Sequence, residues 1–235
     1  MADNFIDIPF EKSNLDRYIV RTSILQAITE RLPILNGKLL DAGCGKMPYK
    51  EFILSKSNVE QYVGLDIDSA LVYDSEIGPD ITWDGKIMPF DNNSFNSCMA
   101  TEVLEHCPEP EVFLKEVHRV LMPGGIIFFT VPFLWPLHEV PHDEYRYTPF
   151  SLQRHLENSG FTQIEISSLG GWNASLAQMM GLWVRRSPMS SKKRSILSKL
   201  FLPVIKHLLK TDLIPEHHSE RNMVTGFAGV AYKPQ

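Results

Sequence analysis

The fold of this chain is decided by residues 38–45, which read Lys38-Leu39-Leu40-Asp41-Ala42-Gly43-Cys44-Gly45. A short apolar run passes directly into an acid and two glycines. In a parallel α/β sheet, a strand that enters a glycine-rich turn begins a nucleotide-type cofactor site, because glycine lets the backbone approach a ligand where a Cβ would collide. The pattern is a weak signal alone, so its meaning depends on the residues that stand at fixed distances after it.

The composition is that of an ordinary globular protein. The chain has 235 residues and a formal net charge of −5, which suits one domain with a sizeable core and argues against a general nucleic-acid binder. Its three cysteines include no CxxC pair, so we expect neither a disulfide framework nor a zinc knuckle. We therefore expect the protein to reside in a reducing compartment. Because we find no secretion signal and no run of about 20 apolar residues, we expect a cytoplasmic protein, soluble or peripheral to a membrane.

Strands and helices alternate along most of the chain. Apolar spacing predicts helices over residues 14–32, 49–55, 110–121 and 151–159, with Pro123-Gly124-Gly125 stopping the third. Strands are predicted over residues 38–42, 61–66, 81–83, 95–100, 126–131, 161–168 and 224–232. This order predicts the α/β class, as a three-layer, Rossmann-like domain with a mostly parallel sheet.

We expect a single domain over residues 1–235. Its parts are an N-terminal helix (1–36), a core (37–168), a helical insertion or lid (170–222) and a last strand (223–235). Between Gly170 and Thr211 there are eight Lys or Arg residues and no Asp or Glu, which leaves −13 for the rest once these charges are subtracted from −5. The insertion is interpreted as a cap on the sheet, a dimer interface, a lid, or a contact with an anionic membrane through residues 190–211.

The apolar residues of that insertion fall on one helical stripe. Pro203 interrupts it and would kink a continuous helix. The stripe consists of Ile196, Leu197, Leu200, Phe201, Val204, Ile205, Leu208 and Leu209.

Three aspartates stand at the ends of consecutive predicted strands: Asp41, Asp66 and Asp84. Ligands of an open α/β sheet bind beyond the carboxyl ends of its strands. Asp66 follows Gly45 by 21 residues, close to the offset of about 20 for an acid that binds ribose hydroxyls. Asp84 can accept a hydrogen bond from an adenine amine, and Asp41 can face an ammonium group. Such a set fits S-adenosylmethionine.

Other interpretations of these residues are weaker. A single aspartate is more often a helix cap than a ligand, but three at consecutive strand ends after a glycine turn are an improbable coincidence. A dinucleotide fingerprint requires a third glycine where this chain has Pro48, so nicotinamide and flavin dinucleotides are disfavoured.

Six short segments occur in order along the chain: residues 40–45, Val63-Gly64-Leu65-Asp66, Asp84 with Met88-Pro89-Phe90, Ser94-Phe95, Glu102-Val103-Leu104-Glu105-His106, and Glu116 with residues 119–125. In this order and spacing they resemble the motifs of class I S-adenosylmethionine-dependent methyltransferases, in the small-molecule, type 11-like branch. The resemblance covers about residues 39–168 and returns at the last strand. It implies a seven-stranded sheet whose antiparallel last strand lies between the fifth and the sixth.

The resemblance implies S-adenosylmethionine as the cofactor. Asp41, Gly43 and Gly45 would approach its methionine part, Asp66 its ribose, and Asp84 with Gly85 its adenine. Residues 102–106 would line the methionine end, although Glu102 could instead complement a helix dipole. The full set expected at the cofactor is Asp41, Gly43, Cys44, Gly45, Asp66, Ile67, Asp84, Gly85, Thr101, Glu102 and His106.

The acceptor side is expected after the fifth strand. Residues 131–148 are dense in aromatic, ionisable and proline residues, and resemble the acceptor side of a subset of the family. Our hypothesis is that His138 or His142 is the general base and that Tyr145 and Arg146 position the substrate. The alternative is that Asp143 pairs with Arg146 structurally and that His142 only caps the loop.

A metal site is not predicted. The histidines considered for one are His138, His142, His217 and His218. The first two lie in a proline-rich loop and not on one helix face, whereas zinc prefers a compact set of at least three donors.

The sequence favours an enzyme, a transferase that moves a methyl group by in-line displacement to a small-molecule, glycan-linked or lipid-linked acceptor. One alternative is an RNA methyltransferase, which the acidic net charge disfavours and the basic insertion keeps open. Another is a non-catalytic scaffold subunit with the same fold, which would have no physical need for the Asp41, Gly43, Gly45 and Asp66 set. The acceptor and the oligomeric state stay open.

Overall fold

The computed structural model describes residues 5–68 and 78–235. The chain forms two compact units. One consists of Met1–Ala27, Pro132–Pro136 and Ser167–Phe227, and the other of Ile28–Val131, Leu137–Ile166 and Ala228–Gln235. The second unit contains most of the sheet and all of the candidate site. The single domain expected from the sequence stays a prediction.

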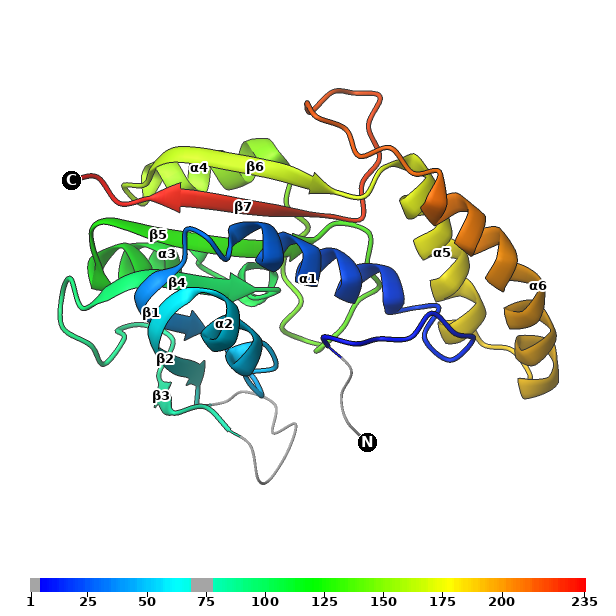
Figure 1. The fold of residues 1–235 in the computed structure, drawn as a ribbon, viewed down its shortest axis with the longest axis horizontal. Helices are drawn as coiled ribbons and strands as arrows, with labels where there is room; N and C mark the ends of the chain where they lie inside the picture. The colour runs from blue at the N-terminus through cyan, green and yellow to red at the C-terminus, as the bar shows by residue number, and fades with distance from the viewer. Residues whose placement is uncertain (1–4, 69–77) are drawn as a thin grey trace. The chain divides into compact units, whose positions relative to one another are not determined.

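A seven-stranded sheet is the main element of the fold (Figure 1). Its spatial order is β3-β2-β1-β4-β5-β7-β6. The strands are β1 (Asn36–Ala42), β2 (Asn58–Ile67), β3 (Ile81–Trp83), β4 (Phe95–Thr101), β5 (Leu121–Pro132), β6 (Thr162–Leu169) and β7 (Gly226–Tyr232). Each pair among the first five is parallel. The order reverses between β1 and β4, and such a switch point is where ligands bind in this class of sheet.

The last strand confirms the expected topology. Gly124 N donates to Lys233 O, and Lys233 N donates to Gly125 O, each at 2.9 Å, so the start of β5 meets the end of β7. That pairing is antiparallel, and Figure 1 shows the arrow of β7 running against those of its neighbours. The predicted α/β class, with β7 between β5 and β6, is confirmed.

The central strands are apolar because both faces of the sheet are covered. Leu39, Leu40 and Ala42 in β1 and Ile127 and Phe129 in β5 have no exposed surface. Strands buried on both faces carry continuous apolar runs and not alternating ones. Asp41 is the exception within β1, since it is a charged-type residue at 2% exposure.

The helices of the second unit lie on both faces of the sheet. They are α2 (Lys50–Lys56), α3 (Pro110–Val120) and α4 (Pro149–Asn158), and Figure 1 shows α2 in front of the sheet and the other two behind it. The predicted helix over residues 110–121 ends within one residue of α3, but the predicted start of the next strand at residue 126 is wrong. The helix ends at Val120 and β5 begins at Leu121, so Pro123-Gly124-Gly125 lies inside the irregular start of a strand. Gly124 has a φ of +75°, which allows that strand to bend immediately after the helix.

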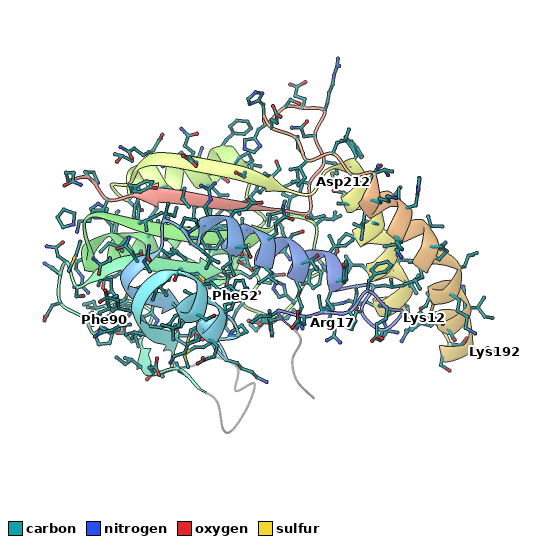
Figure 2. The ribbon with its side chains drawn as sticks, in the orientation of Figure 1. Lys12, Arg17, Phe52, Phe90, Lys192 and Asp212 are labelled. Carbon is teal, nitrogen blue, oxygen red and sulfur yellow. The ribbon has the colours of Figure 1, made fainter. Side chains whose placement is uncertain are left out.

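The other unit is helical. It contains α5 (Trp172–Arg186), α6 (Ser191–Lys210) and most of α1 (Tyr18–Arg31). Its core consists of Leu15, Ile19, Ala177 and Ile205. Asp212 accepts N–H groups of Gly171 and Ala174 at 2.8 and 2.9 Å and so caps the start of α5. Figure 2 shows Asp212 at one end of the α5–α6 pair and Lys192 at the other.

The predicted stripe of α6 divides into two faces. Phe201, Ile205 and Leu208 turn to the core of this unit, whereas Ile196, Leu200 and Val204 are 43–59% exposed. Pro203 lies inside the helix, which continues to Lys210. Within the described residues, no helix is both long and apolar enough to cross a membrane.

Candidate active site

The glycine turn after β1 has one packed side and one open side. Gly43 has a φ of +80°, and a Cβ there would lie 2.5 Å from a methyl carbon of Val103. Gly45 has a φ of +50°, and a Cβ there would meet no atom of the described residues within 4 Å. The turn is held to β2 because the N–H groups of Gly43 and Cys44 donate to Leu65 O at 2.8 and 3.1 Å. The side at Gly45 is therefore open to a ligand.

Asp66, at the end of β2, is fixed beside this turn. Its Oδ2 accepts from Gly45 N at 2.8 Å and its Oδ1 accepts from Ile67 N at 2.8 Å. Burial raises the pKa of Asp66, while these two hydrogen bonds oppose the shift. A carboxylate with two oxygens can accept further hydrogen bonds beyond these two. The structure thus places the predicted ribose ligand next to the predicted methionine turn.

Asp41 is a buried carboxyl group with one partner. Tyr62 Oη donates to its Oδ2 at 2.5 Å, and within the described residues its Oδ1 has no hydrogen-bond partner. Burial raises the pKa of Asp41 to about 7, against the opposing effect of the Tyr62 hydroxyl. A buried acceptor without a donor is costly. It is therefore a place where a bound cationic group would be stabilised.

Asp84 and Gly85 follow β3 in an exposed turn. The Oδ1 of Asp84 accepts from Lys86 N and Ile87 N at 2.9 and 3.2 Å, and these bonds lower the pKa of Asp84. Gly85 has a φ of +78°, and a Cβ there would lie 3.9 Å from Ile67. The turn therefore adjoins Ile67 at the end of β2. Its role toward adenine stays a prediction.

These residues fit S-adenosylmethionine, the group that the sequence motifs imply. The unpartnered oxygen of Asp41 suits the amino group of the methionine part, and the open side of Gly45 leaves room for its chain. The Asp66 carboxylate, held in place by Gly45 and Ile67, suits two ribose hydroxyls.

The end of β4 continues the site. Thr101 lies opposite Thr130 of β5. Glu102 has a φ of +55°, and its Oε1 accepts from Thr130 Oγ1 at 2.9 Å. Burial raises the pKa of Glu102 to about 7. The helix after it, η1 (Leu104–His106), is a single 3₁₀ turn. Such a short helix has only a small dipole, which weakens the alternative that Glu102 complements a helix dipole.

The loop of residues 137–148 is bound to η1 by hydrogen bonds. Glu105 O accepts from Glu144 N at 2.9 Å and from Tyr145 N at 3.1 Å. The ring Nδ1 of His106 lies 3.0 Å from His142 O, and Tyr147 Oη donates to Leu104 O at 2.9 Å. These contacts bring the predicted acceptor loop to the carboxyl end of β4.

His138, Asp143 and Arg146 form a connected group in that loop. Two nitrogens of Arg146 lie 2.6 and 2.8 Å from the two oxygens of Asp143. Asp143 Oδ2 also accepts from His138 N at 3.1 Å and lies 3.2 Å from His138 Nδ1. The Arg146 guanidinium lowers the pKa of Asp143 to about 2, and burial lowers the pKa of His138. Asp143 is thus an anion that fixes the position of a mainly neutral imidazole.

The other predicted acceptor residues lie differently. The side chain of His142 is exposed, and the residue contributes its backbone carbonyl to the contact with His106. Tyr145 Oη donates to Pro108 O at 3.0 Å, which holds that ring against the segment after η1. His217 and His218 belong to the helical unit. The catalytic roles of His138, His142, Tyr145 and Arg146 stay predictions.

Two residues of the site were missed from the sequence. Glu105 is fully buried beside His106, and Tyr62 holds Asp41. Glu105 directly precedes a predicted cofactor residue, which was an available signal. Tyr62 gave no signal, since an aromatic residue in a strand is more often a simple core residue.

Comparisons with known proteins find methyltransferases. A family model described as a methyltransferase domain matches residues 40–129. A malonyl-[acyl-carrier protein] O-methyltransferase of Alcanivorax borkumensis is 28% identical over 128 residues, which are 52% of this chain and 43% of that protein. A fatty-acid O-methyltransferase of Mycolicibacterium smegmatis is 26% identical over 52% of this chain and 47% of its own length. This chain thus spans less than half the length of these two relatives.

A solved structure shares the fold. The phosphoethanolamine N-methyltransferase 2 of Haemonchus contortus, in complex with S-adenosyl-L-methionine, matches with a TM-score of 0.55 and 16% identity over 97% of this chain and 61% of that one. The matched domain contains the glycine turn, Asp66, Asp84 and the Glu102–His106 segment. Residues 40–129 therefore match a methyltransferase domain, and the chain shares the fold of solved S-adenosylmethionine-dependent methyltransferases.

Proposed function

We propose that this protein is an S-adenosylmethionine-dependent methyltransferase whose acceptor is a small molecule, free or linked to a glycan or a lipid. The observation that carries the proposal is the Asp66 carboxylate held by Gly45 N at 2.8 Å, at the ends of two neighbouring parallel strands. The unpartnered Asp41 oxygen belongs to the same turn. The named activities of the relatives from Alcanivorax borkumensis and Mycolicibacterium smegmatis support the same class of reaction.

The chemistry leaves the chain three tasks. When bound, S-adenosylmethionine supplies a methyl group on a positively charged sulfur, which is already an activated leaving group. The acceptor lone pair forms the bond to the methyl carbon, the carbon–sulfur pair stays on sulfur as a neutral thioether, and the acceptor proton leaves to a base. The chain must therefore hold the cofactor, align the acceptor and receive a proton.

Within the loop, His138 is better placed than His142 for the third task. Asp143, which Arg146 holds, accepts from the backbone N–H of His138 at 3.1 Å and lies 3.2 Å from the ring Nδ1. Burial keeps the pKa of His138 below its usual value, so the ring is neutral and able to take a proton near pH 7. Arg146 would then act by fixing Asp143, and Tyr145 by supporting the loop through Pro108.

An exposed surface on α6 favours a lipid-linked acceptor. Ile196, Leu200 and Val204 form an exposed apolar stripe, flanked by the exposed basic residues Lys192, Lys193, Lys199, Lys206 and Lys210. Apolar residues bordered by lysines suit the interface of an anionic membrane. We therefore include contact of residues 190–211 with an anionic membrane, on the cytoplasmic side, in the proposal.

Cofactor binding is the first test. Calorimetry with S-adenosylmethionine should show binding to the full chain, and Asp66→Ala should weaken it about 100-fold, because two hydrogen bonds to a carboxylate are lost. Asp91→Ala is the matched control, since this exposed acid precedes β4 and so lies toward the amino ends of the parallel strands, away from the site at their carboxyl ends. Absence of binding by the unmodified chain would favour the scaffold interpretation.

The base is tested by single replacements. His138→Ala should lower methyl transfer at least about 100-fold with unchanged cofactor affinity, whereas His142→Ala should change it little. Equal rates in both variants, with the cofactor bound normally, would contradict a base in this loop.

The membrane contact needs its own measurement. The chain should sediment with phosphatidylserine vesicles and not with phosphatidylcholine vesicles, and Ile196→Glu/Leu200→Glu should weaken this at least about tenfold. Lys12→Glu is the control, because Lys12 is exposed in the same unit and outside α6 (Figure 2). A dimer that the double variant dissociates, without vesicle binding, would assign this face to a second copy of the chain instead.

A further inference from the structure

Three potential metal ligands meet between η1 and the acceptor loop. One ring nitrogen each of His106 and His138 and one carboxylate oxygen of Glu105 all lie within 4.8 Å of one another. Within residues 5–68 and 78–235 this is the only such group of His, Cys, Asp or Glu side chains. The residues come from opposite sides of the loop contact, so the hydrogen bonds that attach the loop to η1 also assemble this group.

Glu105 gives an independent reason to expect a ligand. Its side chain has no exposed surface, and within the described residues neither of its oxygens has a hydrogen-bond partner. His106 Nε2 lies 3.7 Å from its Oε1. A carboxyl group that is fully buried without a donor is rare because burial costs it the hydrogen bonds of water. A cation at this position would supply the missing interaction.

The tautomer of His106 favours a metal. Its Nδ1 lies 3.0 Å from His142 O, and a carbonyl oxygen only accepts, so Nδ1 carries the hydrogen. In the neutral ring the lone pair is then on Nε2, which lies 3.7 Å from Glu105 Oε1 and 3.8 Å from Glu139 Oε2. Donation of one ring N–H to a backbone carbonyl is the usual way in which a metal-binding histidine is oriented.

His138 has a carboxylate beside its Nδ1, at ion-pair distance and without the geometry of a hydrogen bond. Its Nδ1 lies 3.2 Å from Asp143 Oδ2, and Arg146 holds Asp143 from the other side. The two imidazole rings lie edge to face, with centroids 4.7 Å apart. Both histidines are thus oriented before any ion is present.

We propose that Glu105, His106 and His138 bind a divalent transition-metal ion, with Zn²⁺ as the best match. Two imidazoles and one carboxylate form a known three-ligand set for zinc that leaves a fourth position open. Donors 2.0–2.1 Å from a tetrahedral ion lie about 3.4 Å apart, so small side-chain rotations of about 1 Å would close the present set. The sequence alone did not predict this site, because it gives no reason for residues 105–106 and His138 to meet.

The role of the ion rests on the proposed function. The open position would take the acceptor oxygen and lower its pKa, so that its proton leaves to water and its lone pair attacks the methyl carbon. His138 would then be a ligand and not the base. A doubly protonated His106 paired with Glu105 and Glu139 is the competing explanation of the same geometry.

The test is direct metal binding by the full chain after chelator treatment and dialysis. Calorimetry with Zn²⁺ alone should show one ion per chain, and Co²⁺ alone should give the visible absorption of a four- or five-coordinate ion. Glu105→Gln, His106→Asn and His138→Asn should each weaken Zn²⁺ binding at least about 100-fold. The matched controls are His155→Asn and Glu111→Gln, which form a His–Glu pair at 3.2 Å elsewhere and should leave binding unchanged.

The outcomes separate this inference from the proposed function. Failure of the chain to bind Zn²⁺, or binding that Glu105→Gln leaves unchanged, would overturn the metal site even if S-adenosylmethionine binds normally. Loss of turnover in His138→Asn with unchanged Zn²⁺ affinity would return His138 to the role of base and remove it from the ligands. Zn²⁺ binding without S-adenosylmethionine binding would contradict the proposed function and leave the metal site standing.

Discussion

Two regions make up the site and are held in different ways. The cofactor side, with Gly43 and Asp66, is formed by the ends of the neighbouring strands β1 and β2. The acceptor side, with His138 and Arg146, is formed by the loop of residues 137–148, which is hydrogen-bonded to η1. On the cofactor side, the strand register and two backbone N–H groups fix the carboxylate. On the acceptor side, hydrogen bonds between the loop and η1 fix the position of the loop. Damage to the cofactor side should therefore cost stability and cofactor binding together, whereas damage to the acceptor side should lower turnover or loosen the loop without changing cofactor affinity.

Gly43→Ala should have the largest effect. The new Cβ would lie 2.5 Å from Val103, at a φ of +80°, so we expect a loss of about 3 kcal/mol in the free energy of unfolding and of cofactor binding at least about 100-fold. Denaturant unfolding and calorimetry measure the two quantities. Gly45→Ala is the comparison variant, because its Cβ would meet no atom within 4 Å in the part of the chain that the structure describes. It should cost only about 1 kcal/mol of stability but still obstruct the cofactor. Equal stability losses in both variants would show that the packing against Val103 is not what demands glycine.

Asp143→Asn should have the next largest effect, on the acceptor side. The change removes the charge that Arg146 pairs with and that orients His138. Because a residue that orients a functional histidine typically contributes 10- to 100-fold, we expect a fall in turnover of about 30-fold with unchanged cofactor affinity. Steady-state kinetics beside calorimetry would measure both. A parallel loss of cofactor affinity would mean that the two sides are not independent.

The same difference explains what the sequence could predict. The strand–glycine turn and Asp66 were predictable because parallel neighbours in one sheet bring strand ends together. The position of β7 between β5 and β6 came from the family resemblance and not from periodicity. The meeting of Glu105 with His138 was not predictable, because an irregular loop carries no period that sets its position. The start of β5 was also missed, since the Pro-Gly-Gly segment that was predicted to stop the helix lies inside that strand.

Tyr147→Phe should weaken the attachment of the loop by a smaller amount. Its buried hydroxyl donates to Leu104 O at 2.9 Å. Loss of that bond leaves Leu104 O with Cys107 N, at 3.2 Å, as its donor, so the expected cost is about 1 kcal/mol in the free energy of unfolding. Tyr145→Phe is the matched control, because its bond to Pro108 O is exposed and should contribute less than about 0.5 kcal/mol. Denaturant unfolding measures both. A larger effect at Tyr145 would place the loop attachment at Pro108 instead of Leu104.

The smallest predicted effect is a pH dependence that belongs to the cofactor side. Burial raises the pKa of Asp41 to about 7 in the free protein, so the group is mostly neutral at pH 6 and half ionised at pH 7. The ammonium group of S-adenosylmethionine favours the ionised form, and its own charge is largely retained over this range. Affinity should therefore rise about fivefold from pH 6 to pH 7, in proportion to the ionised fraction. Asp41→Asn keeps an acceptor for Tyr62 but cannot ionise, so its affinity should be lower and nearly independent of pH. Calorimetry at the two pH values measures the change in affinity. If Asp41→Asn shows the same change, another group titrates. Asp66 would be the next residue to replace, because burial raises its pKa as well.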